Sequence, residues 1–200
     1  MERHVADLVG KNIVVFDLEI KRTIEQCSNG WNSHSEMGIS VGCAYDYREC
    51  RYRVFLDDNV EQLITRLNEP GTLVVAFNHI GFDNKLLRVT PGLKVTLKPD
   101  TELRNYDMLL VSRKGAGSGM DRSPGFKLDD HLRSMGLPMK TANGAEAPIW
   151  WQDGRVGAVV DYCLNDVTVE KMLFEQFYVH GQAACAQKPT PYNIEIPAIA

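Results

Sequence analysis

An apolar stretch near the start of the chain, residues 13–19, ends in two acidic residues. Its order, Ile-Val-Val-Phe-Asp-Leu-Glu, begins with a β-branched and aromatic run that predicts a strand buried on both faces. Side chains alternate along a strand, so Asp17 and Glu19 are expected to project from the same face. The alternative is that the strand ends at Phe16 and both acids lie in solvent, because carboxylates are rarely buried without a partner.

Two further strands are predicted over 39–47 and 51–56, because both segments are rich in β-branched and aromatic residues. Together with the first strand they are expected to form an antiparallel meander. A helix follows, with Asp57 and Asp58 as its predicted caps, and residues 73–77 form a second buried strand. This strand, helix, strand order indicates a parallel crossover, so the expected sheet is mixed.

The second half of the chain alternates short periodic segments with polar segments that contain glycine. In chain order the pattern predicts a strand over 105–110, a basic glycine-rich loop over 112–125, a short helix over 128–135, an irregular stretch over 139–151, a long helix over 153–180 and a C-terminal tail over 182–200 with a short strand over 192–196. The predicted fold class is therefore α/β, with one domain over 1–181 and a mixed sheet flanked by helices. The basic loop could close over phosphates or simply be solvated.

Composition narrows the classes of function. A net charge of −4 and a pI near 5.7 argue against a protein that coats duplex nucleic acid by bulk charge, but not against an enzyme that holds nucleic acid locally. The five cysteines show no zinc-ligand spacing, so reduced thiols are expected. With no apolar run of membrane-spanning length, the chain is expected to be soluble and cytoplasmic, with no membrane partner.

Two later acids join the pair in the first strand as candidates for a site. Asp83 lies in the first turn of a predicted helix, at the end of a parallel strand where open α/β sheets bind ligands, although a helix-capping role is the simpler interpretation. Asp166 and Tyr162 interrupt an apolar stripe of the long helix. Four converging carboxylates would repel one another strongly, and oxygen-rich clusters are what Mg²⁺ and Mn²⁺ select. The expected cofactors are therefore two Mg²⁺ or Mn²⁺ ions.

With these residues the chain resembles the DEDD superfamily of 3′-to-5′ exonucleases, which have an RNase H-like fold. The motifs that carry the resemblance are Asp17-Leu18-Glu19, Asn78 through Phe82-Asp83, and Tyr162-Cys163-Leu164-Asn165-Asp166. A tyrosine four residues before the last aspartate is typical of the DEDDy branch. More specifically, the chain is similar to bacterial predicted exonucleases of the polymerase-B-like type over most of residues 12–181. Ile20 departs from the pattern, because many members carry Thr or Ser there.

The resemblance implies a metal-dependent exonuclease that removes nucleotides from a free 3′ end, with single-stranded DNA favoured over RNA. It implies that Asp17, Glu19, Asp83 and Asp166 hold the ions and that Tyr162 positions the attacking water. A phenol with a pKa near 10 is a poor base at neutral pH, so Tyr162 is expected mainly to orient the attacking water. Two alternatives remain: a non-catalytic nucleic-acid-binding module on the same fold, and an RNase or structure-specific endonuclease that uses the same carboxylates.

Contacts to the substrate are less determined by the sequence. The candidates are Asn78, His79 and Phe82 beside the second motif, Lys127 and Lys140 with Arg113 and Arg122 for phosphates, and Trp31, Trp150 or Trp151 for stacking on a base. For Trp31 a role as a core anchor is the favoured interpretation, because large aromatic side chains are usually buried. For His79 a structural role in the loop is an equal alternative.

Overall fold

The computed structural model describes residues 2–118, 124–141 and 144–199. Its centre is a five-stranded sheet in the order β3-β2-β1-β4-β5. The strands are β1 (Ile13–Ile20), β2 (Ile39–Asp46), β3 (Arg51–Leu56), β4 (Leu73–Ala76) and β5 (Arg104–Asp107). Strands β1, β2 and β3 pair antiparallel, whereas β4 runs parallel to both β1 and β5. The predicted α/β class, with a meander and a parallel crossover in one mixed sheet, is confirmed.

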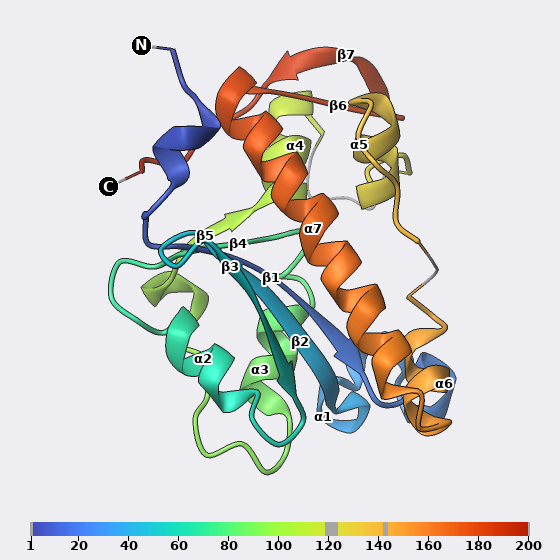
Figure 1. The fold of residues 1–200 in the computed structure, drawn as a ribbon. Coiled ribbons are helices and arrows are strands. Elements are labelled where there is room, and N and C mark those ends of the chain that lie inside the picture. The colour runs from blue at the N-terminus through green and yellow to red at the C-terminus, as the bar shows by residue number, and fades with distance from the viewer. Residues whose placement is uncertain (1, 119–123, 142–143, 200) are drawn as a thin grey trace.

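Helices cover both faces of this sheet (Figure 1). The long helix α7 (Val156–His180) crosses one face diagonally, and α2 (Glu61–Leu67) and α3 (Asp83–Val89) cover the other. The remaining α-helices of the described residues are α1 (His34–Met37), α4 (Met108–Ala116), α5 (Leu128–Ser134) and α6 (Ala147–Gln152). Short 3₁₀ helices span Val5–Leu8, Ile24–Gln26, Gly30–Asn32 and Asp100–Glu102. Within the described ranges, no helix combines the length and the apolar character that crossing a membrane requires.

Strand β1 divides its side chains between the two layers as the period of two predicts. Its even-numbered residues, such as Val14 and Phe16, pack in the core under α2 and α3, whereas Ile13 and Val15 pack in the core under α7. Continuing the same alternation, Asp17 and Glu19 face α7. The strand therefore delivers both acids to the side of the sheet on which the third motif lies.

Two local predictions for the middle of the chain were wrong. The strand expected over 105–110 ends at Asp107, whose carboxylate accepts hydrogen bonds from the backbone amides of Leu109 (3.1 Å) and Leu110 (3.3 Å) and so begins α4. The first part of the expected basic loop is consequently helical, and Arg113 packs over the ring of Phe126. Arg122 lies outside the described residues.

Two further local predictions also differ from the structure. Asp57 does not cap α2 but pairs with Lys21 at 2.7 Å, and the helix begins at Glu61, whose side chain accepts a hydrogen bond from the backbone of Lys94. The stretch over 139–151, expected to be irregular, ends in helix α6, which has Pro148 in its first turn. A helix of six residues is too short to show a periodic pattern in the sequence.

The C-terminal residues form a hairpin that packs on the domain. Strands β6 (Gln182–Cys185) and β7 (Lys188–Asn193) pair antiparallel, where one short strand over 192–196 was expected. Ala183, Cys185 and Tyr192 are buried in the same core as the α7 face of the sheet. Tyr106 of β5 donates a hydrogen bond to the carbonyl of Glu195 at 2.9 Å, which ties the last residues to the sheet edge.

Candidate metal centre

The four acids predicted from the sequence lie together where β1 and α7 face each other. Burial and then the negative charge of Asp166 raise the pKa of Asp17 to about 7. Burial also raises the pKa of Glu19 well above its usual range, and the charges of Asp17, Asp166 and Asp83 add to this effect. Burial and then the charge of Asp17 raise the pKa of Asp83 well above its usual range. Because each carboxylate acts on its neighbours, they form one cluster.

Strand β1 continues past both of its acids. Asp17 pairs with Cys43 of β2 and Glu19 with Val41, and the register shifts only between Glu19 and Ile20. The alternative in which the strand ends at Phe16 is therefore wrong. Asp17 is partly exposed and Glu19 is buried, so the cluster meets solvent on the side of Asp17.

The loop between β4 and α3 brings Asp83 to the cluster. It turns at Asn78, which has a left-handed backbone (φ 67°), and a Cβ on Gly81 would overlap the Asn78 side chain. Asp107 fastens the loop from β5, since its two carboxylate oxygens accept the amides of Asn78 and Ile80, both at 3.1 Å. The sequence analysis missed Asp107, because the strand predicted over 105–110 placed this residue in the middle of the strand and not at its end.

Helix α7 contributes a fifth buried carboxylate, Glu170, that the sequence analysis also missed. It is one turn after Asp166 and is 3% exposed. Its Oε2 accepts the backbone amide of Phe77 at the end of β4, at 3.3 Å. Burial and then the charges of Asp17, Asp83 and Asp166 raise its pKa well above the usual range. Glu170 continues the spacing of four set by Tyr162 and Asp166 along the helix, and this spacing was the signal that could have identified it.

The sequence suggested that Lys140 contacts phosphates, but in the structure its ammonium is paired with Asp166. Its Nζ lies 2.5 Å from Oδ2 of Asp166, and the side chains are 23% and 4% exposed. Burial disfavours the charged form of Lys140, but the charges of Asp166 and Asp17 outweigh burial and raise its pKa. An ammonium group is thus held inside the acidic cluster.

Tyr162 is placed as expected, one turn before Asp166, and is 3% exposed. Trp150 packs edge-on against its ring, with centroids 6.1 Å apart. Burial and then the charge of Asp166 raise the pKa of Tyr162, so it remains a neutral phenol. Among the described residues, Tyr162 Oη and Asp166 Oδ1 are buried without a hydrogen-bond partner. Unpaired buried polar atoms of this kind are uncommon, so these two atoms are candidates to contact a ligand.

The donor set at the cluster suits a hard divalent cation. Ligand atoms of Asp17, Glu19 and Cys163 lie within 4.8 Å of one another. Burial raises the pKa of the Cys163 thiol, and Cys43 and Asp17 add to that effect, so Cys163 is not a thiolate ligand. Mg²⁺ and Mn²⁺ prefer oxygen ligands, and the carboxylates, with the unpaired Oδ1 of Asp166, supply them.

The aromatic residues expected to contact a base differ in exposure, because Trp31 is exposed whereas Trp150 and Trp151 are half-buried. Trp31 is 62% exposed, so the favoured interpretation as a core anchor was wrong. Its ring centroid lies 5.7 Å from that of Phe82, and the ring centroid of His34 lies 5.6 Å from that of Phe82. We call Trp31, His34 and Phe82 the aromatic cluster. It adjoins Asp83 directly through Phe82.

The other predicted contacts are not equally accessible. His79 has no exposed surface: its ring nitrogens lie 3.3 Å from the Ala76 carbonyl and 3.1 Å from Asn105 Oδ1, which favours the structural alternative. Burial lowers the pKa of His79, so the ring is neutral at pH 7. Asn78 and Lys127 are exposed. Lys127 precedes the first turn of α5, where its amide is bonded to Asp130 at 2.8 Å.

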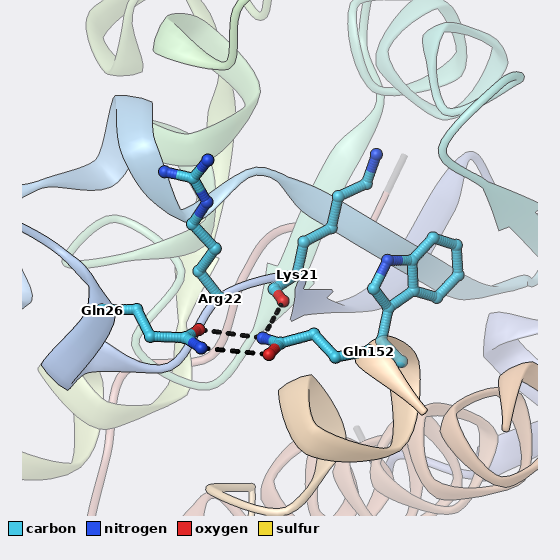
Figure 2. A pocket seen from close by; sticks show the side chains of 5 residues that line it. Lys21, Arg22, Gln26 and Gln152 are labelled. Carbon is cyan, nitrogen blue, oxygen red and sulfur yellow. Dashed lines mark hydrogen bonds between the residues drawn. The ribbon is translucent and has the colours of Figure 1, made fainter. Parts of the chain in front are cut away.

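An open cavity of about 570 Å³ lies beyond the end of β1. Its lining residues are Lys21, Arg22, Gln26, Trp151 and Gln152. Figure 2 shows the amides of Gln26 and Gln152 paired reciprocally (3.0 and 2.8 Å), with Gln152 also donating to the Lys21 carbonyl at 2.8 Å. The pair fastens α6 to the segment that follows Glu19. None of the acids of the cluster lines this cavity, but its lining residues Lys21 and Arg22 follow Glu19 closely in the sequence.

Comparison with known proteins adds no identification. No protein-family model matches the sequence, and no curated protein matches it either. What the site can do is therefore argued from its geometry. The residues present are five buried or partly buried carboxylates, one paired lysine and one neutral tyrosine.

Proposed function

We propose that this chain is a metal-dependent 3′-to-5′ exonuclease with an RNase H-like fold, of the DEDDy type, and that single-stranded DNA is its preferred substrate. The observation that carries the proposal is one acidic cluster, in which the charges of Asp17, Asp166 and Asp83 all act on Glu19 and Tyr162 lies one helical turn before Asp166. The sheet order, with an antiparallel meander beside two parallel strands, is compatible with such a fold.

The four acids would hold two Mg²⁺ or Mn²⁺ ions. The chemistry that such a pair supplies when bound is a lower pKa for the attacking water and neutralisation of charge on the attacking and leaving oxygens. Asp17 and Glu19 are held rigidly by β1, and Asp83 by the loop that Asp107 fastens. Rigid support of this kind keeps ligands in position, because the protein does not have to reorganise during the reaction.

Tyr162 would orient the attacking water. Its raised pKa excludes a role as a general base at neutral pH, and its unpaired Oη can donate a hydrogen bond to a water or a phosphate oxygen. Trp150 limits the movement of the Tyr162 ring, so the hydroxyl has a defined direction. The residue therefore contributes position, which governs how often the water lies in line with the scissile bond.

The aromatic cluster offers a surface on which the 3′-terminal base could stack. Trp31 is exposed and Phe82 is half-buried, and Phe82 directly precedes Asp83, one of the proposed metal ligands. Stacking on aromatic rings is tolerant of sequence and requires an unpaired base, which favours a single-stranded end. Asn78 and Lys127 are exposed and remain candidates for contacts to the backbone.

One gel tests the proposal. The full chain is incubated with 5′-labelled single-stranded DNA, duplex DNA and RNA, each with Mg²⁺, Mn²⁺ or EDTA. A ladder that shortens from the 3′ end, fastest for single-stranded DNA and lost in EDTA, is the expected result. An intact band with retained binding would instead identify a non-catalytic module, and discrete internal cuts would identify an endonuclease.

A further inference from the structure

Lys140 occupies the place of a cation in the acidic cluster. Its Nζ contacts Oδ2 of Asp166 at 2.5 Å and lies 5.3 Å from the centre of the Tyr162 ring. Its positive charge acts on four carboxylates of the cluster: Asp17, Glu19, Asp166 and Glu170. A single ammonium thus offsets part of the repulsion among the buried acids.

We propose that Lys140 is a tethered counter-ion that holds Asp166 when no divalent ion is bound, and that the ion displaces it. The inference rests on the metal site of the proposed function. An ion bound by Asp166 and an ammonium bonded to the same carboxylate would place three positive charges within a few ångströms. Their repulsion is strong in a cluster shielded from water. The two cations therefore compete for one carboxylate.

An opposing effect has to be weighed. Lys140 also fixes the orientation of Asp166 and leaves its Oδ1 unpaired, which could prepare that oxygen for an ion. What this saves is the rotational freedom of one short side chain, which is a small entropy. The repulsion between an ammonium and a doubly charged ion is the larger effect at such a separation. Lys140 should therefore weaken the binding of a divalent ion overall.

The connection that carries Lys140 allows it to leave. The residue lies between α5 and α6 rather than within a helix or strand, and its side chain is 23% exposed. A lysine has a flexible four-carbon stem, so its ammonium can reach solvent without movement of the backbone. After displacement, the same ammonium is available for a substrate phosphate. Binding of the ion would thus prepare one contact for the nucleic acid.

Titration calorimetry with Mn²⁺ alone, without nucleic acid, tests the competition. The full chain is compared with Lys140→Met, which removes the charge, and with Lys140→Arg, which keeps it. Lys127→Met is the matched control, because Lys127 is an exposed lysine with no ion pair among the described residues. We expect Mn²⁺ to bind Lys140→Met about tenfold more tightly or better than wild type, with the other two variants unchanged.

A second measurement needs no variant and covers the case in which Lys140→Met fails to fold. Lysines of the wild-type chain are acetylated with and without Mn²⁺ and quantified by mass spectrometry. Acetylation of Lys140 should rise on addition of Mn²⁺, whereas that of Lys127 should not change. Mn²⁺ binding without this rise, or with equal or weaker affinity in a folded Lys140→Met, would overturn the competition and leave the nuclease proposal standing. Absence of Mn²⁺ binding in every variant would overturn both.

Discussion

The molecule contains two buried groups of polar side chains on the same side of the sheet, and they are built in opposite ways. In the first, Ser112 Oγ lies 2.6 Å from His131 Nε2 and 2.6 Å from Tyr192 Oη, and His131 Nδ1 lies 2.9 Å from the Lys127 carbonyl. These three side chains therefore have partners. In the second, the acidic cluster, Asp166 Oδ1 and a neighbouring hydroxyl have none among the described residues.

The difference indicates what each group does. The Ser112 network joins α4, α5 and the C-terminal hairpin, and a satisfied network of this kind makes a fold more rigid. The acidic cluster concentrates like charges whose pKa values are raised by burial, with Lys140 as the compensating cation. Such an arrangement costs stability, and proteins keep costly arrangements mainly at functional sites.

The largest expected effect separates two roles within the acidic cluster. Asp166→Ala should abolish both Mn²⁺ binding and cleavage, because losing a ligand of the proposed metal site costs several kcal/mol, or about 1,000-fold in rate. Tyr162→Phe should slow cleavage by about tenfold to a hundredfold and leave Mn²⁺ affinity intact, because only the position of the water is disturbed. Calorimetry and the gel assay measure the two properties. Equal loss of metal binding in both variants would refute this division of roles.

The pH dependence of stability should reveal the strain in the cluster. The pKa of Asp17 is raised from 3.8 to about 7. Between these values the folded state holds a proton that the unfolded state releases, so the free energy of unfolding should fall as pH rises from about 4 to about 7. We expect Asp17→Asn to remove about 2 kcal/mol of this fall, after allowance for its partial exposure.

Urea unfolding of both proteins in EDTA, from pH 4.5 to 7.5, measures that difference. The comparison with Asn keeps the shape of the side chain, so packing is not the variable. If wild type and Asp17→Asn lose stability equally over this range, the acidic cluster is not strained at Asp17.

Removing one member of the Ser112 network should lower stability, whereas removing a charge from the acidic cluster should relieve strain. Ser112→Ala leaves the ring nitrogen of His131 and the hydroxyl of Tyr192 without their shared partner, which should destabilise the fold by about 1–2 kcal/mol. Because none of its three side chains is a proposed metal ligand or substrate contact, cleavage per folded molecule should not change. Thermal unfolding and the gel assay check the two halves of this expectation, and a loss of cleavage without a loss of stability would contradict it.

The smallest expected effect is a gain in stability. Asp83→Asn keeps the size of the side chain but removes one charge from a site where burial and Asp17 raise its pKa. It should stabilise the protein without metal by about 1 kcal/mol at pH 7.5, while weakening Mn²⁺ binding. Urea unfolding in EDTA is the measurement. A destabilised Asp83→Asn would mean that the carboxylate holds the fold together and that the two polar groups are not opposites.

Local patterns in the sequence were sufficient for the elements that carry the four predicted acids. The β-branched run before Asp17 is a strong signal because a strand buried on both faces requires it. The apolar pattern of α7 is a strong signal because it repeats at helical spacing over a long segment. The signals failed at Asp107, where a strand passes into a helix at one residue. They also failed at α6, which is too short to show a period.

The sequence by itself determined which residues alternate along β1 and which share a stripe of α7, because these follow from the fixed periods of strand and helix. It also determined that Asp17, Glu19 and Asp166 were candidates for one cluster. Only the tertiary structure decided that Lys140 pairs with Asp166, that Glu170 joins the acids and that Trp31 is exposed. Those three facts are contacts between distant segments, or the lack of them, and no local period encodes the packing that produces them.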